Sequence, residues 1–292
     1  MNRIQSIALA AAAAAAMVPQ LVQAQAFPDK PITFVVPFAA GTATDQIARA
    51  IGNGITAETK QAVVIDNKAG ASGFIASQQV AKAAPDGYTV LITTNTTHAA
   101  NEHLFKKLPY DPVKDFAPIT ALGKGGQIMV VNPSFPAKTV AEFVALAKKE
   151  PGKYSFGSGS SSSRMAGELL QQMADIKLLH VPYKSNTLAV TDLLGGQISM
   201  MITDTATGLP QVKSGKLRAL GMSSSNRSPL APDVPTIAEA GVKGYEMGYW
   251  FAAYAPAKTP PAVIKRLNEL LVKAATSEAA KTAFYEPTGT EV

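Results

Sequence analysis

Four turns along the sequence are built from residue types that can bind a small anion. They lie at 38–45, 67–73, 93–98 and 157–163, are rich in Gly, Ala, Ser, Thr and Asn, and lead into helical patterns. Backbone N–H groups at a helix start lack intrahelical partners, and the helix dipole favours negative charge there. A single serine or threonine in such a turn is most often only a helix cap. Four such turns at one sheet edge are better explained by a shared ligand cleft.

Three charged residues lie beside these turns. Arg164 is expected in the first turn of a helix, where its charge opposes the dipole and needs a carboxylate from the protein or a ligand. Asp204 ends an apolar run, and we expect it to cap the next helix rather than to hold a ligand amine. Lys184 is expected to be a solvated surface cation.

Motifs for catalysis, metals and cofactors are absent from the sequence. It has no cysteine and three histidines, none in a His-Glu-x-x-His pair, so we predict no metal site and no cofactor. A serine of the run 158–163 would be a nucleophile only with His98 or His180 as its base. We expect His98 to be a turn residue and His180 a buried strand residue, so a secreted serine hydrolase is a remote alternative.

The composition indicates a globular protein. Of the 292 residues, 47% are hydrophobic and 16% are charged, which is enough apolar material for a core. The net charge of +6 is spread over single lysines, without a basic stretch interleaved with aromatic residues. Nucleic acid is therefore not an expected partner.

Residues 1–26 have the pattern of a secretory signal peptide. Arg3 precedes an apolar stretch at 7–18, Pro19 follows, and small residues predict cleavage after Ala24 or Ala26. The apolar stretch is shorter than the about 20 residues of a spanning helix, and no later stretch reaches that length. We predict secretion across the inner membrane into the periplasm, without stable membrane insertion.

The elements that must position the turns alternate in type. Runs at 32–36, 62–65 and 88–92 read as strands, and helical patterns such as Ile47, Ile51 and Ile55 follow the turns. The same order continues to residue 202. The alternation predicts an α/β protein with a parallel sheet. Expected hinge crossings near 116–123 and 217–223 give a discontinuous domain 1 at 27–120 and 222–292 and a domain 2 at 121–221.

Eight motifs make the sequence resemble a known family, the Bug-type extracytoplasmic solute receptors of tripartite tricarboxylate transporters. The resemblance runs from Phe27 nearly to the end of the chain. The motifs occur in the order Phe27–Ile32, Val36–Asp45, Asn67–Gly73, Ala84–Thr89, Leu108–Phe116, His180–Lys184, Thr191–Gly196 and Gly215–Leu220.

The resemblance implies a two-domain Venus-flytrap periplasmic binding protein fold with a ligand cleft between the domains. Backbone N–H groups, hydroxyls and waters of the cleft turns would hold a small carboxylate. With Phe38, Phe74 and Arg164 added from the residues themselves, the predicted contacts are Phe38, Ala40, Gly41, Thr42, Ala43, Thr44, Ser72, Gly73, Phe74, Asn95, Thr96, Thr97, His98, Ser158, Ser160, Ser161, Ser162, Arg164 and Asp204.

The chain departs from the family pattern at the pocket and at its end. Thr42, Ser72 and Ser185–Asn186 stand where the family commonly has glycine, and Arg164 stands where it commonly has histidine. These differences imply a smaller, more hydroxylated pocket. Family members continue past 286–290 into another helix, so we expect a truncated C-terminus.

Together these features predict a monomeric periplasmic protein that captures a small carboxylate for membrane transporter subunits. A dicarboxylate is favoured. Phe38, Phe74 and Trp250 could flank a flat apolar body, which extends the expectation to aromatic diacids such as terephthalate. The alternative from another class is a sensor subunit that presents its ligand to a membrane kinase, and a partner pull-down with and without ligand separates the two.

Overall fold

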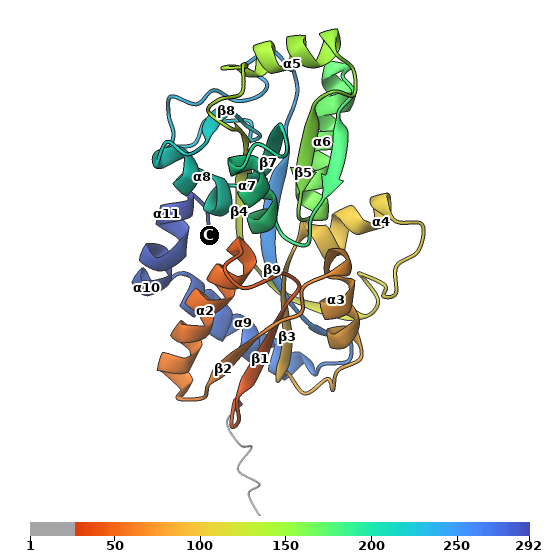
Figure 1. Ribbon diagram of the computed structural model, residues 1–292. Coiled ribbons are helices and arrows are strands. Elements are labelled where there is room, and N and C mark those ends of the chain that lie inside the picture. The colour runs from red at the N-terminus through yellow and green to blue at the C-terminus, as the bar shows by residue number, and fades with distance from the viewer. Residues whose placement is uncertain (1–26) are drawn as a thin grey trace, which may run out of the picture.

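The computed structural model describes residues 27–292, and the expected signal peptide lies outside the described residues. Two α/β units are joined by two long strands, β4 (Phe116–Val131) and β9 (Gly248–Pro256) (Figure 1). Strands and helices alternate within both units, so the α/β prediction is confirmed. Within 27–292, no helix has the length and apolar character needed to cross a membrane.

The first unit contains the three strand–turn–helix repeats expected near the N-terminus. β1 pairs in parallel with β2 and β3, and β9 runs antiparallel to β3. Helices cover this part of the sheet, which explains why the apolar run of β1 is almost wholly buried. The elements are β1 (Ile32–Val36), α2 (Ala43–Thr59), β2 (Val63–Asn67), η1 (Ala71–Gly73), α3 (Phe74–Ala81), β3 (Thr89–Thr94), η2 (Thr96–Ala100) and α4 (Asn101–Leu104).

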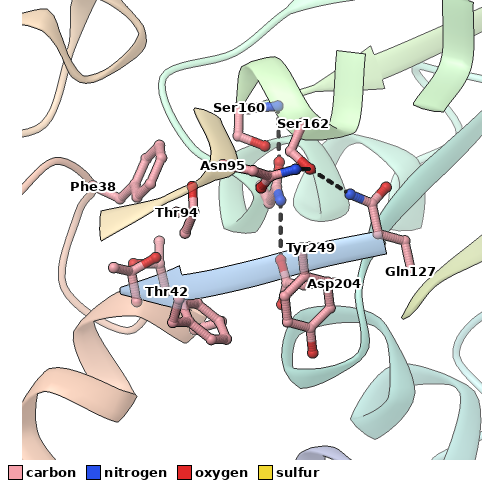
Figure 2. A pocket seen from close by; sticks show the side chains of 14 residues that line it. Phe38, Thr42, Thr94, Asn95, Gln127, Ser160, Ser162, Asp204 and Tyr249 are labelled. Atoms are coloured by element: carbon pink, nitrogen blue, oxygen red, sulfur yellow. Dashed lines mark hydrogen bonds between the residues drawn. The ribbon is translucent and has the colours of Figure 1, made fainter. Parts of the chain in front are cut away.

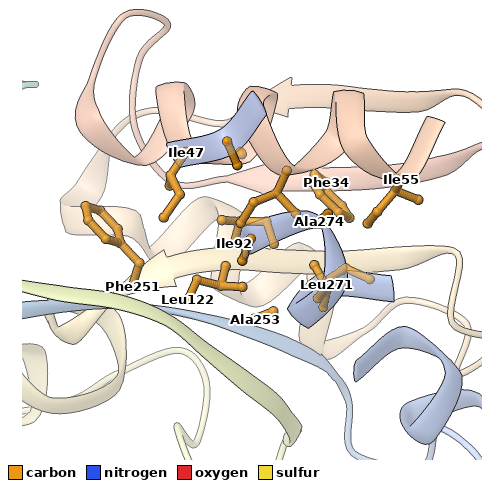
Figure 3. Packing of buried hydrophobic residues seen from close by; sticks show 14 of the residues in the cluster. Phe34, Ile47, Ile55, Ile92, Leu122, Phe251, Ala253, Leu271 and Ala274 are labelled. Atoms are coloured by element: carbon orange, nitrogen blue, oxygen red, sulfur yellow. The ribbon is translucent and has the colours of Figure 1, made fainter. Parts of the chain in front are cut away.

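The core of the first unit lies between this sheet and two helices. α2 packs beside α9 (Pro261–Ala275), far away in the sequence, and both bury their apolar faces against the strands (Figure 3). Ile47, Ile51 and Ile55 recur every four residues on α2 and are at most 1% exposed. The short segments α10 (Glu278–Ala280), η3 (Lys281–Tyr285) and α11 (Glu286–Thr288) follow α9.

The second unit repeats the same architecture. β5 pairs in parallel with β6 and β7, while β7 and β8 both run antiparallel to β4. Its elements are α5 (Val140–Lys149), β5 (Ser155–Ser158), α6 (Ser161–Ala174), β6 (Leu179–Pro182), α7 (Asn186–Leu194), β7 (Met200–Asp204), α8 (Thr205–Lys213) and β8 (Arg218–Met222).

β4 connects the two units because it changes partners along its length. Residues 116–126 pair with β9, whereas residues 127–131 pair with β7 and β8. On the return path, Ile237, Val242 and Tyr245 are still packed in a core cluster of the second unit. We therefore propose that the chain crosses between the units at 126–127 and at 247–248, instead of crossing back at 217–223.

The serine-rich turn is shorter than expected. α6 begins at Ser161, three residues before the predicted start at Arg164, because the Ser160 hydroxyl accepts a hydrogen bond from the backbone N–H of Ser163 at 3.1 Å. Ser160 is therefore the helix cap. Ser161, Ser162 and Ser163 form the first helical turn, and Arg164 lies just after it.

Candidate functional site

Two adjoining chambers lie between the units and share Phe38, Gly159 and Ser160 in their walls. The first chamber has an empty volume of about 440 Å³ including its mouth, and the second about 990 Å³. The first chamber (Figure 2) is lined by Phe38, Thr42, Ala43, Thr44, Thr94, Asn95, Gln127, Gly159, Ser160, Ser162, Asn186, Asp204, Tyr249 and Phe251. The second is lined by Pro37, Phe38, Gly70, Ala71, Ser72, Gly73, Phe105, Ser158, Gly159, Ser160, Ser161, Arg164, His180, Pro182, Tyr183 and Lys184.

The turn between β1 and α2 is fixed by Asp45. Its buried carboxylate accepts hydrogen bonds from the backbone N–H of Gly41 at 2.9 Å and from Asn67 Nδ2 at 3.0 Å, and it pairs with Arg49. Burial would raise the pKa of Asp45, but these donors outweigh it and hold the pKa below its ordinary value. The Thr42 hydroxyl donates back to the Ala39 carbonyl at 2.7 Å instead of capping α2.

Ser162 lies where the two units meet. Its hydroxyl oxygen accepts hydrogen bonds from Asn95 Nδ2 at 3.3 Å and from Gln127 Nε2 at 2.7 Å (Figure 2). Because both lone pairs are used, the O–H proton of Ser162 is left for a third partner. The Ser160 hydroxyl oxygen already accepts a hydrogen bond from the backbone N–H of Ser163. The O–H proton of Ser160 is therefore also left for the first chamber. The chamber therefore offers neutral hydroxyl donors to a ligand oxygen.

Further hydrogen bonds connect η2 and α4 of the first unit with the start of α6. The backbone N–H of Ser162 donates to Thr96 Oγ1 at 3.3 Å, and the Ser161 hydroxyl donates to Asn101 Oδ1 at 2.6 Å. The Ser162 N–H, which we expected to face an anion, is thus used within the protein. Thr96 is buried behind the wall and does not line either chamber.

Asp204 has the capping role that we expected. Its carboxylate accepts from the backbone N–H of Thr207 at 2.8 Å at the start of α8, and from Asn186 Nδ2 at 3.0 Å. Asn186 Oδ1 in turn accepts from the backbone N–H of Gly159 at 2.9 Å. Asp204 is the only charged side chain in the lining of the first chamber among the described residues, so a bound carboxylate must lie away from it.

Cationic side chains lie in the second chamber. Arg164 Nε is 3.5 Å from Glu168 Oε1, so the compensating carboxylate that we expected comes at least partly from the protein. His180 Nε2 lies 2.7 Å from the Ser158 hydroxyl. Burial and, after it, the charge of Arg164 lower the pKa of His180. The half-buried His180 is thus hydrogen-bonded at the chamber wall, not enclosed in the core as predicted.

Six predicted contacts lie outside both chamber linings: Ala40, Gly41, Phe74, Thr96, Thr97 and His98. Phe74 packs against Phe105, with ring centroids 4.9 Å apart. His98 lies in η2 rather than in an open turn, stacked on Tyr254 at 3.9 Å and edge-on to Phe116 at 4.7 Å. Thr97 bonds to the His98 ring behind the wall. Phe74, Thr97 and His98 thus pack behind the chamber walls, whereas Ala40 and Gly41 are exposed residues of the turn before α2.

The chambers also contain residues that the sequence did not single out as contacts. For the first chamber these are Gln127, Tyr249 and Phe251, whereas Thr94 and Gly159 lie within the predicted turns 93–98 and 157–163, and Asn186 was named as a departure at the pocket. Strand alternation explains two of them. Successive side chains of β9 point to opposite faces, so Tyr249 and Phe251 line the first chamber, while Trp250 lines only a neighbouring groove that Tyr249 also lines. We expected Trp250 to flank the ligand. It does not line the first chamber, so it is not placed to do so there.

Burial of His98 predicts a pH-dependent stability. Burial lowers the pKa of His98 to about 4, from 6.5. The unfolded chain therefore binds the extra proton between pH 6.5 and 4, and stability is lost as pH falls through that window. We expect His98 to account for about 2 kcal/mol of lost unfolding free energy between pH 7 and pH 5.

Urea denaturation of wild type and His98→Gln at both pH values measures this effect. The variant should lose about 2 kcal/mol less than wild type over the same interval, whatever its stability at pH 7. Equal losses in the two proteins would show that His98 titrates normally in the folded state.

Known proteins share both the sequence and the fold. The profile of tripartite tricarboxylate transporter family receptors matches residues 47–291. BugT of Bordetella pertussis is 35% identical over 274 residues, covering 93% of this chain and 84% of BugT. A solved structure of an R. palustris protein with adipate is 33% identical, with a TM-score of 0.87 over 91% of this chain and 89% of that one. MatC from Rhodopseudomonas palustris, with bound malate, is 32% identical, with a TM-score of 0.87 over 91% of each chain.

Proposed function

The chain belongs to the family of tripartite tricarboxylate transporter receptors, and we propose that it captures a small carboxylate in the periplasm for the membrane subunits of such a transporter. The family is one of receptors, not enzymes, and two further solved structures with TM-scores of 0.87 and 0.86 are of a periplasmic transporter and of the periplasmic binding protein BugD. The Ser158–His180 hydrogen bond is accordingly part of a binding wall and not of a serine hydrolase site.

The observation that carries the proposal is the hydroxyl lining of the first chamber. Ser160 and Ser162 each have an oxygen that already accepts hydrogen bonds and a proton left to donate. Both residues stand at the start of α6, where the helix dipole favours a negative charge. A carboxylate oxygen fits this set of donors, whereas an ester or amide lacks the charge that the helix start favours.

The position of the chambers supports capture by closure. The turn 38–44 belongs to the first unit and the start of α6 to the second, and each supplies only part of the first chamber wall. A ligand that contacts both units stabilises the arrangement in which they are close together. We infer that a dicarboxylate is the preferred class, in line with the adipate and malate bound in the two solved relatives.

A thermal-shift screen of acids beside their neutral derivatives tests the proposed function. The screen compares aliphatic and aromatic acids, such as adipate, malate and terephthalate, with their methyl esters. A bound acid at 100 times its dissociation constant should add about 2.7 kcal/mol to the unfolding free energy, whereas its ester should add almost nothing. If esters stabilise the protein as well as the acids do, the anion site does not exist.

A further inference from the structure

The second chamber differs from the first in charge. Among the described residues its lining contains the cations Arg164 and Lys184 and no carboxylate, whereas the first chamber contains Asp204 as its only charged side chain. The two chambers meet at Phe38, Gly159 and Ser160. One elongated molecule can therefore place one end among neutral hydroxyls and the other end beside positive charge.

Arg164 has donor capacity that the protein does not use. Its Nε is buried and has no hydrogen-bond partner among residues 27–292. The Glu168 carboxylate lies 3.5 Å from this nitrogen as an ion pair, but not in hydrogen-bonding geometry. A guanidinium has five N–H donors in a planar fork that fits a carboxylate. The side chain lines the second chamber and is 37% exposed, although Nε itself is buried.

The opposite wall of the second chamber is a turn in an unusual conformation. Gly70, Ala71, Ser72 and Gly73 all have positive φ, at 125°, 46°, 51° and 84°. Ala71 and Ser72 carry side chains and are therefore strained there. Asn101 Nδ2 holds the turn by donating to the Ser72 carbonyl at 2.9 Å. Strain of this kind concentrates at ligand clamps, which is consistent with a binding role for this wall.

We propose that the second chamber binds the second acid group of the ligand, and that Arg164 is the residue that selects diacids over monoacids. This inference rests on the proposed function, because it requires the first acid group to be held near Ser160 and Ser162. The ligand class is then a molecule with two carboxylates on a linker that passes Phe38. Glu168 competes with the ligand for the guanidinium.

Isothermal titration calorimetry on the mature chain tests the proposal with two matched ligand pairs, adipate with hexanoate and terephthalate with benzoate. The variant is Arg164→Gln. The control is Arg266→Gln on α9, which also removes one positive charge. Like Arg164, Arg266 is partly exposed, at 40%, and forms an ion pair at 3.5 Å with a glutamate of its own helix, Glu269. Glu168→Gln removes the internal competitor of the ligand.

We expect Arg164→Gln to weaken the binding of a diacid about 10- to 100-fold, the factor for one hydrogen-bonded charge pair, and its matched monoacid less than about threefold. Arg266→Gln should change neither affinity. Glu168→Gln should leave diacid binding unchanged or tighten it, because it frees the guanidinium.

Equal losses for diacid and monoacid in Arg164→Gln, or no loss in either, would overturn the role of Arg164 while the proposed function stands. Failure of both diacids to bind the wild type, with a monoacid still binding, would overturn the diacid class and the role of Arg164 together, while the capture of a carboxylate stands. If no acid of any kind binds the wild type, the proposed function itself is wrong, and the inference fails with it.

Discussion

Gly159→Ala is expected to destabilise the protein by more than about 3 kcal/mol and to abolish ligand binding, beyond the usual range for overpacking. A Cβ at this position would lie 1.8 Å from the carbonyl carbon of Ser185 and 2.1 Å from the nitrogen of Asn186. Both are backbone atoms, so no side-chain rotation relieves the clash. Two turns of the second unit would have to separate, breaking the hydrogen bond from the Gly159 N–H to Asn186 Oδ1.

Gly195→Ala is the matched control for this substitution. Gly195 has a φ of −78°, which alanine adopts without strain, and its added Cβ would meet the nearest atoms at an ordinary 3.6 Å. Urea denaturation should show a change of less than about 1 kcal/mol for the control. A Gly159→Ala protein as stable as the control would mean that the turns 157–160 and 184–187 do not approach each other as described.

Asp45→Asn is expected to cost about 3 kcal/mol of unfolding free energy, at the low end for removing one partner of a buried ion pair because Arg49 is half exposed. The amide that replaces the carboxylate keeps one acceptor oxygen, and its NH2 group must face either Asn67 Nδ2 or the Gly41 N–H, both of which are donors themselves. The turn that lines the first chamber should loosen, so ligand affinity should fall as well.

The pH dependence of this loss identifies its cause. The folded pKa of Asp45 is below its ordinary value, so its contribution is present above about pH 4 and is lost as pH falls through the folded value. The stability difference between wild type and Asp45→Asn should therefore shrink in acid. Asp233→Asn, at an exposed aspartate, serves as the charge-matched control and should cost less than about 0.5 kcal/mol. A difference that does not change with pH would point to packing rather than charge.

The local periodicity of the sequence was sufficient to predict most elements of the fold. The spacing of Ile47, Ile51 and Ile55 indicates a helix wherever the chain lies, because it depends only on helix geometry. The return crossing was harder to place, because it depends on whether Ile237, Val242 and Tyr245 pack with the second unit or the first. Tertiary contacts determine with which unit these residues pack, and such contacts cannot be recognised from the local sequence pattern.

The chamber walls show the same limit. Turn residues such as Thr42 and Ser162 could be predicted because a strand end followed by a helix start places them at one sheet edge. Alternation along β9 places Trp250 on the opposite face of the strand from Tyr249 and Phe251. Which of the two faces is toward the cleft depends on how β9 packs in the fold. His98 was predicted at the surface of the site since it follows a strand, yet η2 turns it inward against Tyr254.

The most direct test of the account is a crystal structure of the mature protein with the acid that stabilises it most in the screen. One carboxylate should lie in the first chamber within hydrogen-bonding distance of the Ser160 and Ser162 hydroxyls, with both units in contact with the ligand. An acid bound only outside the cleft, for example in the groove beside Trp250, or a cleft that holds no acid at saturating concentration, would contradict the account.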